Sequence, residues 1–140
     1  MANINSKLIF KNYVVEKVDF EANFEYSGED REIKFDFNSN YTFDNNTFML
    51  NLETIVFPES KINDYPFTIR VKLIGLFEIE AETTEKDKID FAEKNSIAIL
   101  FPYVRSLISL YTANANIGTT ILPPINVVKY LEDKKNKKGI

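Results

Sequence analysis

The chain of 140 residues contains no cysteine and no histidine, and it has only four glycines. The absence of cysteine excludes disulfides and thiolate nucleophiles. Without either residue, Cys/His zinc sites and histidine-based catalytic triads are excluded as well. The glycines are too scattered to form a dinucleotide-binding fingerprint or a phosphate-binding loop. We therefore expect a protein that is not an enzyme, with no catalytic residues, no metal site and no cofactor.

Positive charge and long apolar runs are also limited. The net charge is −4, although the last nine residues carry four lysines against two acids. An acidic body lacks the clustered positive charge that binds phosphate backbones, so nucleic acid is not an expected partner. No run approaches the ~18 apolar residues that span a bilayer, and residues 1–20 lack the apolar stretch of a secretory signal. We expect a cytoplasmic protein with no membrane partner.

The first part of the chain predicts β-strands. Apolar residues make up 44% of the sequence, enough for a hydrophobic core, and 140 residues suit a single domain. Four segments alternate between apolar and polar residues, the pattern of strands with one buried face. They lie between about residues 8 and 80 and are 14–26, 33–38, 47–57 and 67–79. Short polar connections such as residues 44–46 predict that the strands form an antiparallel sheet.

The second part of the chain predicts helices. Residues 81–95 are charged and indicate a linker with a short helical piece. From Ile97 to Tyr111, apolar residues recur at the spacing of an amphipathic helix, which we predict over about 96–113. Pro102 removes one backbone hydrogen bond, so we expect a kink or a helix start near it. Asn126 is the expected N-cap of a last helix over about 126–134, followed by a basic tail over 135–140.

This order of elements predicts an α+β fold. A four-stranded antiparallel sheet is followed by two helices packed on one of its faces, in one domain over residues 1–140. Two acidic clusters, at Glu78–Glu82 and at Gly28–Glu32, are typical of a solvated sheet face and a solvated turn. The second cluster lacks the ligand spacing of a calcium-binding loop.

Two segments of the second half form the most specific pattern of the chain. Residues 100–109 are Leu-Phe-Pro-Tyr-Val-Arg-Ser-Leu-Ile-Ser, and residues 122–126 are Leu-Pro-Pro-Ile-Asn. Singly these residues suit helix packing and a helix stop, but in this order they resemble the C-terminal signature of the SecB family of bacterial export chaperones. Segments 18–22, 33–37 and 75–79 resemble strands of the same family, so the resemblance covers about residues 10–132. The signature residues are Phe101, Pro102, Tyr103, Arg105, Pro124 and Asn126.

The resemblance implies an ATP-independent holdase chaperone. Such a protein binds unfolded or non-native polypeptides in apolar surface grooves, and it is a homotetramer, a dimer of dimers with helices packed between two sheets. In the family the groove lies between the loop joining the two helices, the last helix and the sheet. By this resemblance the candidate client-binding residues are Phe35, Phe48, Ile117, Ile121, Leu122, Val127 and Tyr130. Each of them also suits ordinary core packing or a subunit contact.

The sequence departs from the resemblance on the solvent face of the sheet. Export chaperones of the family present acidic residues there to dock the translocase motor SecA. At the positions that match, this chain has Lys17 and Arg70 and keeps only Glu21. Opposite charge at two of three contacts weakens such docking. We therefore expect a divergent relative, related to export chaperones but with an antitoxin or a narrow set of clients in place of preproteins in general.

Two other functions stay open at this stage. One is a carrier of a small apolar ligand held between helix and sheet, since a curved sheet covered by helices can enclose a pocket. The other is an enzyme with a carboxylate site, which the composition disfavours. The sequence does not decide between a dimer and a tetramer. It also does not decide whether the groove is accessible to a client or filled by the chain's own segment 114–124.

Overall fold

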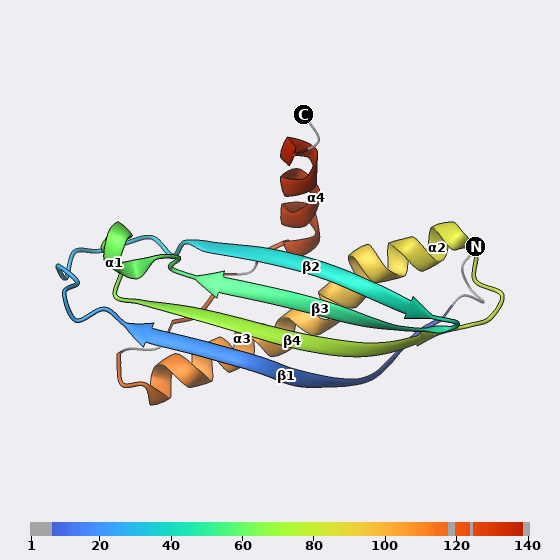
Figure 1. Ribbon diagram of the computed structural model, residues 1–140, viewed down its shortest axis with the longest axis horizontal. Helices are drawn as coiled ribbons and strands as arrows, with labels where there is room; N and C mark the ends of the chain where they lie inside the picture. Colours follow the sequence, from blue (N-terminus) through green and yellow to red (C-terminus); the bar gives the residue numbers. More distant parts are fainter. Residues whose placement is uncertain (1–6, 118–119, 124, 139–140) are drawn as a thin grey trace.

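The sheet has four antiparallel strands. The computed structural model describes residues 7–117, 120–123 and 125–138 (Figure 1). Neighbouring strands pair in the order β1–β4–β3–β2, so β1 and β2 are the two edges. The strands are β1 (Leu8–Ala22), β2 (Phe35–Asp44), β3 (Thr47–Val56) and β4 (Phe67–Ile79). The α+β fold with an antiparallel sheet, predicted from the sequence, is confirmed.

The long helices lie on one side of this sheet and beside one edge. α2, η1 and α3 follow one another without a break and cross one face, whereas α4 rises beside β2 and points away from the sheet (Figure 1). The short α1, which the sequence pattern did not predict, lies between β3 and β4. The helices are α1 (Ser60–Asn63), α2 (Glu85–Asp90), the π-helical η1 (Phe91–Asn95), α3 (Ser96–Asn114) and α4 (Val127–Lys138).

The core lies between α3 and the sheet. Alternate residues of β3 and β4 point toward α3 and are at most 2% exposed; they are Phe48, Leu50, Leu52, Val56, Ile69, Val71, Leu73 and Phe77. Gly75 lies on the same face. A Cβ atom there would lie 2.7 Å from Cε1 of Phe77 and 3.2 Å from Cδ2 of Leu100. At Gly75, where β4 has no side chain, Leu100 of α3 and Phe77 occupy the space that a Cβ atom would need.

The first strand ends earlier than its alternation predicts. β1 stops at Ala22, and Asn23 turns the chain by donating from its backbone N to the Pro66 carbonyl at 2.9 Å. Its side-chain Nδ2 also donates to the carbonyls of Ser60 and Tyr65. Phe24 lies in the segment 14–26, whose alternation assigned it to the apolar face, yet it is 97% exposed. That assignment is wrong because the buried hydrogen bonds of Asn23 end the strand.

The boundaries of the helices also differ from the prediction. All of residues 85–95 are helical where a linker with only a short helical piece was expected; Thr84 caps α2 by accepting from the Asp87 N–H at 3.2 Å. Pro102 lies inside α3 on its exposed side and does not end the helix. α4 continues to Lys138, so its last turn includes lysines that were expected to form a tail.

The joined helix from Glu85 to Asn114 has apolar residues on more than its buried side. It contains an 18-residue window apolar enough to cross a membrane by length and composition, which corrects the expectation that no segment approaches that length. Core helices of soluble proteins pass the same test. In α3, Tyr103 and Leu110 are 39% and 62% exposed, and Arg105 is the only charged residue. α3 thus has an apolar face that the described part of the chain leaves uncovered.

Candidate functional site

Four of the seven candidate client-binding residues reach the surface. Ile117 and Ile121, in the connection between α3 and α4, are 38% and 64% exposed. Phe35 on β2 and Tyr130 on α4 are half-buried and face each other, with ring centroids 5.7 Å apart. Ile117 and Ile121 line a surface hollow that we call the loop hollow, whereas a second hollow beside α4, which we call the α4 hollow, is lined by other residues.

The other three candidates lie in the core. Phe48, Leu122 and Val127 are 2%, 0% and 4% exposed, so a client cannot touch them in this conformation. Phe48 stacks on Phe77 with ring centroids 5.1 Å apart, while Leu122 and Val127 pack into the same cluster of buried residues. Their expected place on an open groove is corrected, because these side chains fix the α3–α4 connection and α4 to the sheet.

The loop hollow lies between the α3–α4 connection and the segments before β2 and β4. Its volume is about 610 Å³. Its apolar wall consists of Tyr26, Ile33, Phe57, Phe67, Ile117 and Ile121. Asp30 and Arg31 also line it. The described part of the connection therefore forms one wall of the hollow and leaves it open.

Polar bonds from α3 hold this connection in place. Thr112 Oγ1 accepts from the Thr120 backbone N–H at 2.9 Å, and Ser109 Oγ donates to the Thr120 carbonyl at 3.3 Å. Arg105 Nη2 donates to the Leu122 carbonyl at 3.1 Å. The wall of the loop hollow is thus fastened at two points, and Ile121 lies between them.

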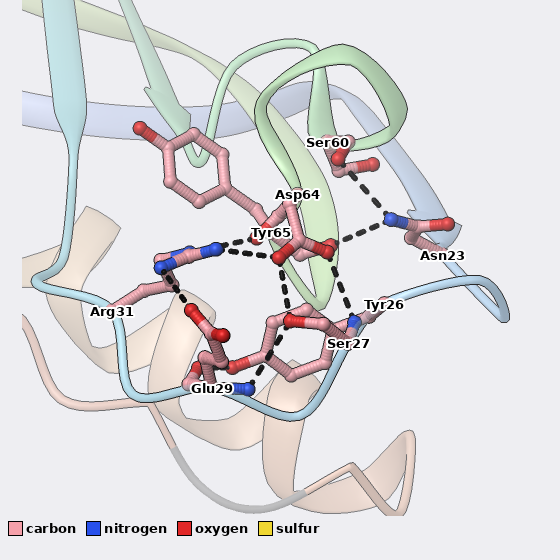
Figure 2. A network of polar contacts seen from close by, with 8 residues as sticks. All are labelled: Asn23, Tyr26, Ser27, Glu29, Arg31, Ser60, Asp64 and Tyr65. Carbon is pink, nitrogen blue, oxygen red and sulfur yellow. Dashed lines mark hydrogen bonds and ion pairs between the residues drawn. The ribbon is translucent and has the colours of Figure 1, made fainter.

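The opposite wall is held by a polar network around Asp64 (Figure 2). The Ser27 backbone N–H and hydroxyl donate to the Asp64 carboxylate at 2.9 and 2.6 Å, and Arg31 pairs with the same group. These hydrogen bonds from Ser27, together with Arg31, hold the pKa of Asp64 below its ordinary value. Because Tyr26 and Arg31 line the loop hollow, the network fixes that wall to the end of α1.

The α4 hollow lies between β2, the η1 region and α4. Its volume is about 630 Å³, and charged residues of both signs line it together with apolar ones. Principal lining residues are Ser39, Tyr41, Glu93, Val128, Leu131 and Lys135. At its base the Tyr41 hydroxyl donates to Glu93 Oε2 at 2.7 Å; this bond, burial and the Glu93 charge raise the pKa of Tyr41.

Asp36 of β2 anchors α4. It accepts from the Tyr130 hydroxyl at 2.8 Å and from Lys134 Nζ at 2.9 and 3.1 Å. Burial raises the pKa of Asp36, but the bonds from Lys134 and Tyr130 and the Lys134 charge outweigh it and lower the pKa below its ordinary value. Burial and the bond to Asp36 raise the pKa of Tyr130 to about 12. We call Asp36, Tyr130 and Lys134 the α4 anchor.

Of the three anchor residues, the sequence analysis named only Tyr130, and it named it as a candidate client-binding residue. Asp36 matched the polar side of a strand, and Lys134 matched a basic helix end. Neither residue carries a local signal for the other, because 98 positions separate them. Only the fold brings the β2 edge next to α4.

The signature residues mostly have structural roles. Phe101 packs edge-on against Phe37, and Tyr103 lies over Tyr13 with ring centroids 4.4 Å apart. Pro102 is exposed. Asn126 caps α4 as predicted, since its Oδ1 accepts from the Lys129 N–H at 3.0 Å. Pro124 lies outside the described residues.

The three residues of the expected docking face lie on the sheet face away from α3. Lys17, Glu21 and Arg70 are all exposed. Lys17 is 3.3 Å from Asp19, and Arg70 is 3.7 Å from Glu53. This face therefore carries alternating charges of both signs around the three positions, and surface pairs of this kind contribute little stability.

A family model of the preprotein translocase subunit SecB matches residues 6–138. The chain belongs to the SecB family. The resemblance predicted from residues 100–126 is thereby confirmed. Among related sequences, the uncharacterized protein MJ0357 of Methanocaldococcus jannaschii is 39% identical to this SecB-family chain over 125 residues, which are 86% of this chain and 79% of that protein.

Two solved structures share the fold of this SecB-family chain. The Rv1957 SecB-like chaperone of Mycobacterium tuberculosis, solved in complex with a ChAD peptide from the Rv1956 HigA1 antitoxin, has a TM-score of 0.68 at 13% identity. The likeness covers 84% of this chain and 90% of that one. A protein of unknown function from Streptococcus agalactiae has a TM-score of 0.55 at 14% identity, covering 84% and 98%. At these identities the likeness shows the fold, and the family supports a chaperone role.

Proposed function

We propose that this SecB-family chain is an ATP-independent holdase that binds unfolded polypeptides along the loop hollow and the α4 hollow. The observation that carries the proposal is the loop hollow, whose wall includes the exposed apolar residues Ile117 and Ile121 in a part of the chain that polar bonds hold in place. A fixed apolar surface can hold a client without collapsing on itself. Phe35 and Tyr130 form a separate half-buried aromatic contact between β2 and α4.

The energy available at one hollow suits reversible binding. Burying ~400 Å² of apolar area at ~25 cal/mol/Å² gives about 10 kcal/mol before the costs of binding. The entropy lost when a flexible client becomes ordered offsets much of that free energy. Several hollows on one oligomer raise the overall affinity through effective concentration. Binding the unfolded state then delays folding by mass action, without a nucleotide.

The uncovered surfaces support the proposal of a homo-oligomer, a dimer of dimers. The apolar outward face of α3 includes Leu110 and Tyr103, and a helix that is apolar on all sides is usually buried. The edge strand β1 also exposes Val14 and Val15, which are 51% and 41% exposed. Long apolar edge strands pair with another chain unless they are protected.

A narrow client set, an antitoxin among the candidates, is part of the proposal. The mixed charge around Lys17, Glu21 and Arg70 gives SecA no continuous acidic surface. The structural neighbour from M. tuberculosis was solved with an antitoxin peptide, which gives a precedent on the same fold. A carrier of small apolar ligands is less favoured, because close contacts such as the one at Gly75 fill the space between α3 and the sheet.

The test is a light-scattering assay of client aggregation in which no nucleotide is present. Purified protein is added to a client diluted from denaturant, and scattering is followed over time. We expect suppression at a near-stoichiometric ratio, unchanged when ATP is added. Unreduced scattering at a large excess of the protein would contradict the holdase proposal. Binding to SecA at micromolar affinity or tighter would contradict the proposal of a narrow client set.

A further inference from the structure

The face of the sheet away from α3 carries an apolar patch. Helices α2 and α3 cover the other face (Figure 1), and outward residues of three strands meet on this one. Val14 of β1 pairs in register with Ile74 of β4, and Met49 of β3 pairs with Leu76 of β4. Val14 and Met49 are 51% and 42% exposed, and the other two are half-buried. We call these four residues the outer patch.

A polar hollow separates the outer patch from the β2 edge. Its volume is about 340 Å³, and the side chains of Asn38, Asn40 and Asn51 contribute to its lining. Asn51 Nδ2 on β3 donates to Asn40 Oδ1 on β2 at 2.8 Å. Asn51 also pairs in register with Ile74, so the hollow borders the outer patch. We call it the asparagine hollow.

Asn38 joins the asparagine hollow to the α4 hollow. It lines both, since β2 is an edge of the sheet and the Asn38 side chain is exposed there. Two strand spacings of about 4.8 Å separate β2 from β4, so an extended chain at about 3.3 Å per residue covers that distance with about three residues. A client held in the α4 hollow can therefore reach the outer patch by a short continuation around the β2 edge.

We propose that an unfolded client continues from the α4 hollow around the β2 edge, across the asparagine hollow and onto the outer patch. This inference rests on the proposed holdase function and extends its binding surface to the second face of the sheet. Side-chain amides both donate and accept hydrogen bonds, so the asparagines can bond the client's backbone whatever its sequence. The flexible side chain of Met49 adapts to varied apolar residues of the client.

The size of the outer patch favours a tethered segment over a second copy of this chain. Its four partly exposed side chains offer much less than the ~800 Å² that each partner of a stable complex buries. A segment already held in the α4 hollow needs little further affinity, because tethering raises its effective concentration at the patch. Glu53 and Lys72 in the asparagine hollow pair with each other at 3.6 Å, so they select no single charge in the client.

Cross-saturation NMR tests this path. The protein is deuterated except at its methyl groups, and the protonated client is reduced, carboxymethylated α-lactalbumin, a permanently unfolded chain. Irradiation of the client's aromatic and Hα protons lowers the signals of the methyl groups that the client touches. We expect the methyl signals of Met49 and Ile74 to lose intensity. Ile62 on α1, which is 79% exposed and outside the path, is the internal control and should keep its intensity.

The outcomes separate this inference from the proposed function. A bound client that lowers the signals of Ile117 and Ile121 but not those of Met49 and Ile74 overturns the path and leaves the holdase proposal intact. If no client binds, both fail. Signals of the outer patch that shift with protein concentration in the absence of client assign the patch to a second copy and overturn the inference.

A pair of substitutions tests the path by affinity. Met49→Asp places a charge in the outer patch, and we expect it to weaken binding of the same client about fivefold, because the complex buries less apolar surface. Ile62→Asp introduces the same charge outside the path and should bind as the wild type does. Equal affinities for the two variants, each shown to be folded by its unfolding transition, contradict the proposal. If Met49→Asp does not fold, the cross-saturation experiment decides.

Discussion

The contact between α3 and the sheet differs in kind from the contact between α4 and the sheet. α3 is held by close-packed apolar side chains such as Leu100, which is 0% exposed, against residues around Gly75. α4 also buries Val127 and packs the Tyr130 ring against Phe35 and Phe37, but in addition it is held to β2 by the hydrogen bonds of Asp36, Tyr130 and Lys134. We therefore expect the loss of the first contact to cost more stability than the loss of the second. We also expect changes in the second contact to alter the surface beside β2 while the fold remains.

The largest expected effect is in the α3 contact. Leu100→Ala removes a fully buried side chain that would leave a cavity beside Gly75, and we expect a loss of about 2–5 kcal/mol in the free energy of unfolding. Leu110→Ala on the same helix is the matched control, because Leu110 is 62% exposed. Chemical denaturation at low protein concentration measures both. Equal losses for the two variants would contradict the packing described for α3.

A smaller effect is expected in the α4 anchor. Asp36→Asn removes the charge that pairs with Lys134, and we expect a loss of about 1 kcal/mol, since the pair is partly exposed. Amide exchange in α4 should rise more than exchange in α3. Asp133, an exposed acid on α4 itself, provides the matched control. Asp133→Asn should change neither the free energy of unfolding nor the amide exchange of α4. Uniform acceleration across both helices would show that α4 and the core unfold together.

The pH dependence gives the smallest effect and has a defined sign. The pKa of Asp36 is lowered in the folded chain, so its contribution to stability is present above its ordinary value of about 3.9 and is lost as the pH falls through the lower folded value. The difference in unfolding free energy between wild type and Asp36→Asn should therefore be full at neutral pH and should close in acid.

Tyr130 has the opposite dependence. Its pKa is raised from an ordinary value of 10.0 to about 12, so its contribution is present below pH 10 and is lost as the pH rises between these values. Tyr130→Phe should differ in stability from wild type at neutral pH and converge with it in strong base. A difference that stays constant from neutral pH to strong base would show that the hydroxyl contributes nothing through Asp36.

The sequence predicted elements whose signals are local. The long alternation from Phe67 to Ile79 correctly marked β4, and the position of Asn126 correctly marked the start of α4, because strand alternation and helix capping act over a few residues. The end of β1 was missed because Asn23 forms its hydrogen bonds with residues near position 60.

The candidate site was predicted in part for the same reason. Ile121 and Leu122 are neighbours of similar apolarity, yet one is 64% exposed and the other is fully buried. The bond from Arg105 to the Leu122 carbonyl is a contact across 17 positions, which no local pattern of the sequence records. The pairing of Asp36 with Lys134 is likewise absent from any local pattern.

The affinity of one matched pair of variants for an unfolded chain tests the central claim most directly. Ile121→Asp places a charge in the wall of the loop hollow, whereas Ile62→Asp makes the same change at a residue on α1 that is 79% exposed and outside the lining of both hollows. The client is reduced, carboxymethylated α-lactalbumin. We expect Ile121→Asp to weaken binding about tenfold or more, because the bound client no longer buries an isoleucine side chain at this position. Ile62→Asp should bind as the wild type does. Equal affinities for Ile121→Asp and the wild type would contradict the assignment of the loop hollow as the client-binding surface.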